Sequence, residues 1–253
     1  VGVSAPAILA GTSGFAYREW IPAFYPPGTR TKDLLAAYAS RLPAVELNHT
    51  YYRMPTVAAA RGWRAQAADG FRFAVKAPMF LTVRKAAFDP APVVAELATA
   101  LAPLGDALGC VFLQFPAHVP VDHGRLDGLL AAMPRDWRCA CEFEHAAWDA
   151  PATTAVLVRH GATRVVRDDD DDDAISDGAI EPAFGWQYVR LRRSAYDESA
   201  LAAWQRRIAA ASRADSYVFF RHEESARGPR LAQQFLALAN RAQPPRASRR
   251  APR

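Results

Sequence analysis

Short apolar runs alternate along the chain with longer stretches of helical periodicity. Eight of these runs are rich in Val, Phe, Leu or Tyr and are bounded by turn-forming or polar residues, which is typical of β-strands. The predicted strands are residues 8–13, 44–48, 71–77, 109–115, 138–145, 163–167, 187–192 and 216–222.

Between the strands, apolar residues recur at the spacing of an amphipathic helix. The predicted helices are residues 31–42, 56–67, 90–104, 122–133, 151–160, 197–211 and 229–241. Asp122 and Asp197 stand where N-cap residues are expected, and Pro151 and Pro229 suit the first helical turn.

The regular alternation of strand and helix predicts an α/β fold, a single TIM-type (β/α)8 barrel over residues 1–241. An open doubly wound sheet is the alternative, although it rarely needs eight such units. The sixth unit is the least regular, because six consecutive aspartates at 168–173 follow its strand. We expect this run to be a solvated, self-repelling loop. Residues 242–253, rich in Pro and Arg, are predicted to form a disordered tail.

The formal net charge of +5 comes mostly from that tail, which holds four arginines and no acid. Nucleic acid is therefore a less favoured partner than a small ligand. No apolar run approaches the ~20 residues of a membrane-spanning helix. We expect no secretory signal, because no basic region precedes the short apolar stretch at residues 1–6, and the three cysteines predict no disulfide framework. We expect a cytoplasmic protein without membrane contact. The sequence does not predict its oligomeric state.

The polar residues of functional interest lie where the predicted strands end, which is where barrels of this type carry their chemistry. Alternation along each strand predicts that one set of side chains points into the barrel mouth. These residues are Glu46, Asn48, Lys76, Gln114, Glu142, Arg190 and Arg192, with His222 after the last strand. We favour a ligand site over the alternative, a buried ion-pair network that closes the mouth.

Aromatic residues gather in the loops after the first two strands. Tyr17, Trp20 and Tyr25 lie near arginines in the first loop, and Tyr52 lies in the second. Such rings can stack on a sugar or a base while an arginine holds an anion. Substrate binding is one interpretation, and a lid that packs its rings over the barrel is the other.

Several segments together resemble one protein family. Residues 11–20 read GTSGFAYREW, residues 45–52 read VELNHTYY, and residues 71–76 read FRFAVK. With Gln114 in the fourth strand and Glu142-Phe143 in the fifth, they resemble the "domain of unknown function 72" (DUF 72, YecE-like) family. The resemblance implies a TIM-type barrel and brings no established function.

The chain departs from that family's usual pattern at three places. It has Val83 and Arg192 where the family commonly has histidines, and Glu144 where the family commonly has an arginine. We therefore expect a divergent branch, in which any role that rests on those family residues is lost.

The leading hypothesis is an enzyme that acts on an anionic, sugar-containing or nucleotide-like substrate. Glu46 and Glu142 would be general acid and base, and Lys76 would stabilise charge. Arg190 and Arg192 would clamp the anion. Hydrolysis, isomerisation and lyase chemistry all stay open. No phosphate-binding glycine loop or metal-ligand spacing occurs, so we predict no cofactor and no metal.

Three alternatives remain. Lys76 could instead form a Schiff base, although two neighbouring glutamates would keep it charged. A metal-dependent phosphodiester hydrolase could use Glu46, Glu142, His145, His222 and the aspartate run. The third alternative is a barrel that binds a nucleotide, sugar or nucleic acid without turnover.

Overall fold

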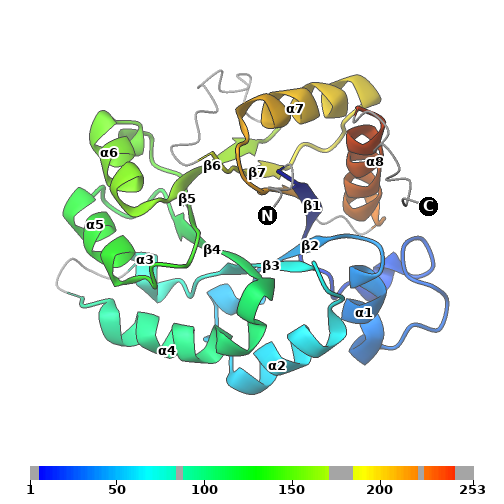
Figure 1. Ribbon diagram of the computed structural model, residues 1–253, viewed down its shortest axis with the longest axis horizontal. Coiled ribbons are helices and arrows are strands. Elements are labelled where there is room, and N and C mark those ends of the chain that lie inside the picture. Colours follow the sequence, from blue (N-terminus) through cyan, green and yellow to red (C-terminus); the bar gives the residue numbers. More distant parts are fainter. Residues whose placement is uncertain (1–5, 84–87, 171–184, 222–224, 243–253) are drawn as a thin grey trace, which may run out of the picture.

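Eight parallel strands close into a barrel in the order of the sequence, which confirms the predicted TIM-type fold (Figure 1). The computed structural model describes residues 6–83, 88–170, 185–221 and 225–242. The last strand pairs with the first, Ile8 opposite Ser216 and Thr12 opposite Phe220. The strands are β1 (Ile8–Ser13), β2 (Ala44–Leu47), β3 (Arg72–Lys76), β4 (Leu108–Phe115), β5 (Cys139–Phe143), β6 (Thr163–Asp168), β7 (Tyr188–Leu191) and β8 (Ser216–Phe220).

Helices surround the barrel as an outer ring (Figure 1). The α-helices are α1 (Leu34–Ala39), α2 (Val57–Gln66), α3 (Phe80–Val83), α4 (Ala91–Leu101), α5 (His123–Ala132), α6 (Pro151–His160), α7 (Glu198–Ala211) and α8 (Arg227–Ala242). Short segments of 3-10 helix are η1 (Arg18–Trp20), η2 (Thr31–Asp33), η3 (His49–Tyr51), η4 (Ala102–Ala107) and η5 (Ala146–Trp148).

Local sequence signals set several of these boundaries. The carboxylates of Asp122 and Asp197 accept hydrogen bonds from the backbone N–H groups of Arg125 and Ala200, so both act as the predicted N-caps. Pro151 begins α6 as predicted. Some predicted strands were too long at their carboxyl ends, because the polar residues there belong to the loops that follow. Asn48 is the N-cap residue of η3, and β5 ends before Glu144.

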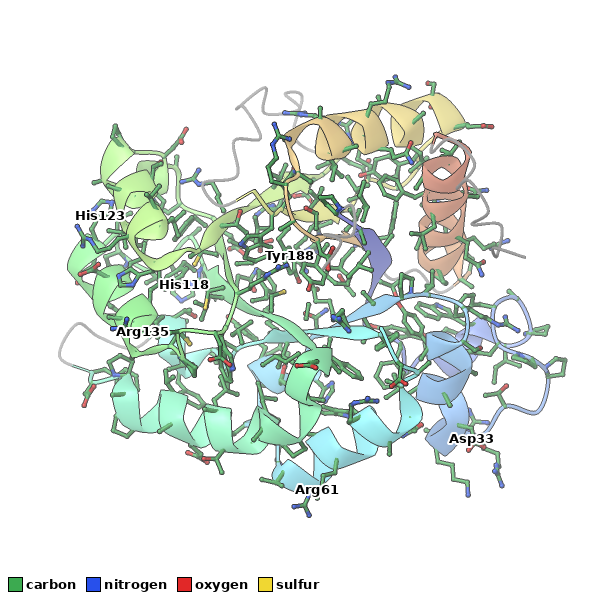
Figure 2. The ribbon with its side chains drawn as sticks, in the orientation of Figure 1. Asp33, Arg61, His118, His123, Arg135 and Tyr188 are labelled. Carbon is green, nitrogen blue, oxygen red and sulfur yellow. The ribbon has the colours of Figure 1, made fainter. Side chains whose placement is uncertain are left out.

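The barrel interior is filled by its own side chains and is not a pore. An inner cluster of small and aromatic residues occupies it below the mouth. Tyr188 points into this interior (Figure 2) and stacks on Phe112, with ring centroids 5.3 Å apart. A second, larger apolar cluster lies between the strands and the helices. Glu46, Glu142 and Arg190 lie above the inner cluster, toward the carboxyl ends of their strands. At the other end, Arg138 lies just before β5, with its guanidinium 5.7 Å from the ring centroid of Trp186.

A tyrosine ties β1 to β2 at a point where only glycine fits. The hydroxyl of Tyr38 accepts a hydrogen bond from the backbone N–H of Thr12 at 2.8 Å and donates to the carbonyl of Ala44 at 2.9 Å. A Cβ atom on Gly11 would lie 1.9 Å from that same carbonyl oxygen. Close approach of two strands, not a special backbone angle, fixes this glycine.

We expect Gly11→Ala to lower the free energy of unfolding by about 1–3 kcal/mol, because the strands and Tyr38 must move apart. Urea denaturation measures the change. Gly62→Ala is the matched control, since its new Cβ meets nothing within 4 Å in the middle of α2. That control should gain about 0.5–1 kcal/mol. Equal effects of the two substitutions would contradict the close approach at Gly11.

Candidate functional site

An arginine in the centre of the barrel mouth joins two buried glutamates. Arg190 on β7 donates one guanidinium nitrogen, Nη1, to Oε2 of Glu142 at 2.8 Å and the other, Nη2, to Oε1 of Glu46 at 3.1 Å. The side chains of Arg190, Glu46 and Glu142 are 5%, 0% and 2% exposed. Burial alone would lower the pKa of Arg190, but the two carboxylates outweigh it and raise that pKa. We call Glu46, Arg190 and Glu142 the buried triad.

Glu46 has every contact a buried carboxylate needs. Oε1 also accepts a hydrogen bond from Ser13 at 2.8 Å, and Oε2 accepts one from the hydroxyl of Tyr188 at 2.5 Å. Burial would raise the pKa of Glu46, but Arg190, Tyr188, Ser13 and Lys76 together lower it below its ordinary value. No atom of Glu46 is accessible to a substrate, so the expected acid or base role for Glu46 does not fit this arrangement.

A cavity of about 630 Å³ opens above the triad. It is lined by Gln114, Ala117, Glu142, Glu144, Arg167, Asp169, Asp170, Arg192 and Arg221. Its most distinctive feature is a shared amide: Nε2 of Gln114 donates to Oε1 of Glu142 at 2.8 Å and to Oε1 of Glu144 at 2.6 Å. Two carboxylates are thus held next to each other at the cavity wall.

Arginines supply the positive charge in the cavity. Asp169 lies between two of them, with Nε of Arg167 at 2.8 Å and Nε of Arg192 at 3.2 Å from its carboxylate oxygens. The predicted anion clamp of Arg190 and Arg192 is therefore wrong for Arg190, because the guanidinium of Arg190 is already held by two glutamates. Arg192 does line the cavity, together with Arg167 and Arg221.

The aspartate run begins as a structured segment, which corrects the expectation of a solvated loop. Asp168 ends β6 and is 2% exposed. Its carboxylate pairs with Arg193 at 2.5 Å and accepts a hydrogen bond from the indole N–H of Trp204 at 2.9 Å. Asp170 accepts from the backbone N–H of Ser194. The rest of the run, 171–173, lies outside the described residues.

Lys76 stands at the end of β3 with only 9% of its surface exposed. Its Nζ lies 4.0 Å from the ring centroid of Tyr51 and 5.4 Å from that of Phe112. Among the described residues, no carboxylate lies within the 4.0 Å of an ion pair. Burial lowers the pKa of Lys76 from its ordinary value; Arg190 and Arg192 act in the same direction, and Glu46 and Glu142 oppose it.

The aromatic residues after β1 mainly pack against one another, as in the lid interpretation. Trp20 and Tyr25 are 0% exposed, and their rings stack at 5.9 Å. The prediction that these two rings bind substrate is corrected, because this packing leaves neither ring a surface for a ligand. Tyr17 is half-buried and donates to the carbonyl of Ser13, while Tyr52 is 79% exposed.

Asn48 is half-buried at the start of η3, and its Oδ1 atom has no hydrogen-bond partner in the described structure. His222 lies outside the described residues. Of the metal-ligand set of the alternative hypothesis, Glu46 is enclosed and Nδ1 of His145 accepts a hydrogen bond from Ala147, while residues 171–173, like His222, lie outside the described residues. In the part of the chain that the structure describes, no three His, Cys, Asp or Glu side chains are grouped to hold a metal ion.

Six of the residues that line the cavity were not among the predicted site residues: Ala117, Glu144, Arg167, Asp169, Asp170 and Arg221. The signal was present, because the inward positions of the strands continue past the strand ends. On β5 the series runs from Glu142 to Glu144, and on β8 it runs from Phe219 to Arg221. None of the described helices is long and apolar enough to cross a membrane.

Comparison with known sequences finds one family. A family model described as "Protein of unknown function DUF72" matches residues 9–253. The UPF0759 protein YecE of Escherichia coli (strain K12) is 31% identical over 112 residues, which cover 44% of this chain and 41% of YecE. The UPF0759 protein YunF of Bacillus subtilis (strain 168) is 28% identical over 152 residues, which cover 57% of this chain and 53% of YunF. The chain thus matches about half the length of these relatives.

Solved structures with the same architecture also exist. A DUF72 family protein from Thermotoga maritima MSB8 superposes with a TM-score of 0.78 at 24% identity, covering 92% of this chain and 99% of that one. A DUF72 family protein from Enterococcus faecalis V583 gives a TM-score of 0.72 at 16% identity, covering 92% and 95%. These similarities support the fold and identify no substrate.

We expect Arg190→Met to lower the free energy of unfolding by about 3–5 kcal/mol at neutral pH, because it leaves two buried carboxylates without their cation. The lowered pKa of Glu46 stabilises the wild type above the ordinary value of 4.5 and ceases to do so as the pH falls. In the Arg190→Met variant, Glu46 has lost its cation, and protonation at low pH removes its unpaired buried charge. The difference in free energy of unfolding between the wild type and Arg190→Met should therefore become smaller as the pH falls.

Urea denaturation of both proteins at neutral pH and near pH 4 measures this difference in free energy of unfolding at each pH. Arg30→Met is the control, since Arg30 pairs with Asp33 at the surface, where the side chains are 69% and 43% exposed. That variant should change stability little at either pH. A loss for Arg190→Met that is small, or that stays constant with pH, would contradict the triad.

Proposed function

The chain belongs to the DUF72 family of proteins of unknown function, and we propose that it is an enzyme that acts at the barrel mouth. Its substrate is a small polar molecule that carries hydroxyl groups and an anionic group, such as a sugar phosphate or a nucleotide. One observation carries the proposal: Glu142 and Glu144 share the amide of Gln114 at the wall of a cavity of about 630 Å³. Paired carboxylates of this kind perform acid/base chemistry.

The two carboxylates stand in different surroundings, which supports different roles. Glu142 is buried and paired with Arg190, a contact that suits a carboxylate acting as base. Glu144 is exposed, and no basic side chain of the described residues lies within ion-pair distance of it. Glu144 can therefore contact a substrate in the cavity directly. The amide of Gln114 has two N–H groups and can hold both carboxylates in place.

The other wall of the cavity supports binding of an anion. Arg192 and Arg221 line this wall with guanidinium groups, which match phosphate or carboxylate geometry, and Arg192 also pairs with Asp169. Four acids and three arginines line the cavity, so a small ligand with one anionic group fits better than a polyanion. The cavity volume lies within the ~300–1,000 Å³ usual for small-molecule sites.

A second function, binding without turnover, is supported by the contacts of Glu142. One of its oxygens accepts from Gln114 and the other from Arg190. Each oxygen of Glu142 thus already accepts one hydrogen bond, which leaves fewer positions for a proton from a substrate. The same barrel could therefore hold its ligand as a binding protein, and measurement of turnover separates the two functions.

We expect Glu142→Gln and Glu144→Gln each to reduce turnover by about 100-fold or more, because each removes one proton-transfer group. A panel of sugar phosphates, sugar acids and nucleotides, followed by NMR, identifies a converted compound and then measures the variants. Glu96→Gln, on the exposed side of α4, is the control and should leave turnover unchanged. Turnover that survives both cavity substitutions would contradict the assignment. Tight binding with no conversion would favour the binding barrel.

A further inference from the structure

Lys76 is an inward-facing amine at the end of a strand, in the place where the barrel carries its chemistry. It ends β3, and its register partner on β4 is Phe112. The next inward residue of β4 is Gln114, which lines the cavity and holds Glu142 and Glu144. Lys76 thus lies one inward position below the paired Gln114 and Glu142, and Glu144 follows just beyond the end of β5.

The two glutamates that could have neutralised Lys76 are engaged elsewhere. Glu46 and Glu142 each accept a guanidinium nitrogen of Arg190. This changes the expectation from the sequence, in which both glutamates keep the lysine charged. The amine instead faces the ring of Tyr51 at 4.0 Å and that of Phe112 at 5.4 Å. The ring faces attract a charged amine, but burial and the lack of a close carboxylate among the described residues remove much of the solvation that favours the charged form.

The charged and titratable groups around Lys76 come from four other elements. Glu46 lies on β2 and Glu142 on β5. Arg190 lies on β7, Arg192 lies just beyond the end of that strand, and Tyr51 belongs to η3. The two arginines repel a protonated amine, and the two glutamates attract it. Burial is the largest influence, and the net result is a lowered pKa for Lys76.

We propose that Lys76 is a nucleophilic amine that forms a Schiff base with an anionic aldehyde or ketone bound at the barrel mouth. The inference rests on the proposed function for delivery of the substrate and names its class: a molecule with a free carbonyl, such as an open-chain sugar phosphate. Desolvated lysines at the carboxyl ends of barrel strands have the reactivity that this step requires.

The step balances with groups that are present. The neutral Nζ adds to the carbonyl carbon, a C–N bond forms, and the carbonyl oxygen becomes a hydroxyl by taking the proton that leaves nitrogen. A second proton, supplied by the acid form of Glu144 or by solvent, lets that hydroxyl leave as water. The remaining bond between carbon and Nζ is a protonated imine. Amine, carbonyl and one proton thus give iminium and water, with no change of oxidation state.

The composition makes this step simple to test, because the chain has only three lysines: Lys32, Lys76 and Lys85. The full-length protein is incubated with D-glyceraldehyde 3-phosphate and sodium cyanoborohydride, which reduces an iminium to a stable secondary amine. Peptide mass spectrometry then measures the rate at each lysine. We expect Lys76 to be modified at least tenfold faster than Lys32, an exposed lysine in η2 that serves as an internal reference.

Two further measurements connect the adduct to the mouth. Uncharged D-glyceraldehyde should modify Lys76 more slowly than the phosphate ester, and inorganic phosphate should slow the reaction of the ester at Lys76 but not at Lys32. Lys76→Arg should lose the adduct while circular dichroism shows a folded barrel. If that variant does not fold, the comparison of Lys76 with Lys32 in the wild type still decides.

Modification of Lys76 at the same rate as Lys32, or slower, would overturn the inference. The outcome is separable from that of the proposed function. A fast adduct at Lys76, with turnover unaffected by Glu142→Gln and Glu144→Gln, would support the Schiff base and contradict the acid/base pair. Turnover that needs both glutamates, without an adduct at Lys76, would contradict the Schiff base alone.

Discussion

The ion pairs of Arg190 with Glu46 and Glu142 determine what the rest of the barrel mouth can do. Three charged groups lie where water barely reaches, and each would be costly to bury without the others. Their pairing commits Glu46 to a structural position, since Ser13 and Tyr188 occupy its remaining sites. It also takes from Lys76 the carboxylates that would otherwise neutralise it. The chemistry of the mouth therefore depends on contacts that join β2, β5 and β7.

The barrel architecture produces this layering from simple alternation. Inward positions low in the strands are apolar or aromatic and fill the interior. The next inward positions carry the buried triad, and positions at or beyond the strand ends carry Gln114, Glu144 and Arg192 around the cavity. The filled interior excludes water from the triad, and Glu142 of the triad lines the cavity above.

Much of this arrangement could be predicted from the sequence because it depends on local pattern. Strand and helix periodicity gave the barrel, and the period of two placed Glu46, Lys76 and Glu142 in one mouth. What could not be predicted are partners distant along the chain, such as Tyr188 for Glu46 or Arg190 for both glutamates. Trp20 was misassigned for a related reason: an aromatic residue next to arginines has the same local pattern whether it binds a ligand or packs, as it does here on Tyr25.

Glu144 shows how a departure from a family's usual pattern can add a group. Where the resemblance leads one to expect an arginine, this chain places a second carboxylate on the amide of Gln114. Below Glu144, the buried triad depends on the ion pair of Arg190 with Glu46. A double-mutant cycle between Arg190→Met and Glu46→Gln, read as the free energy of unfolding, measures this dependence most directly. The structure predicts a coupling energy above about 1 kcal/mol; a coupling near zero would contradict the buried triad.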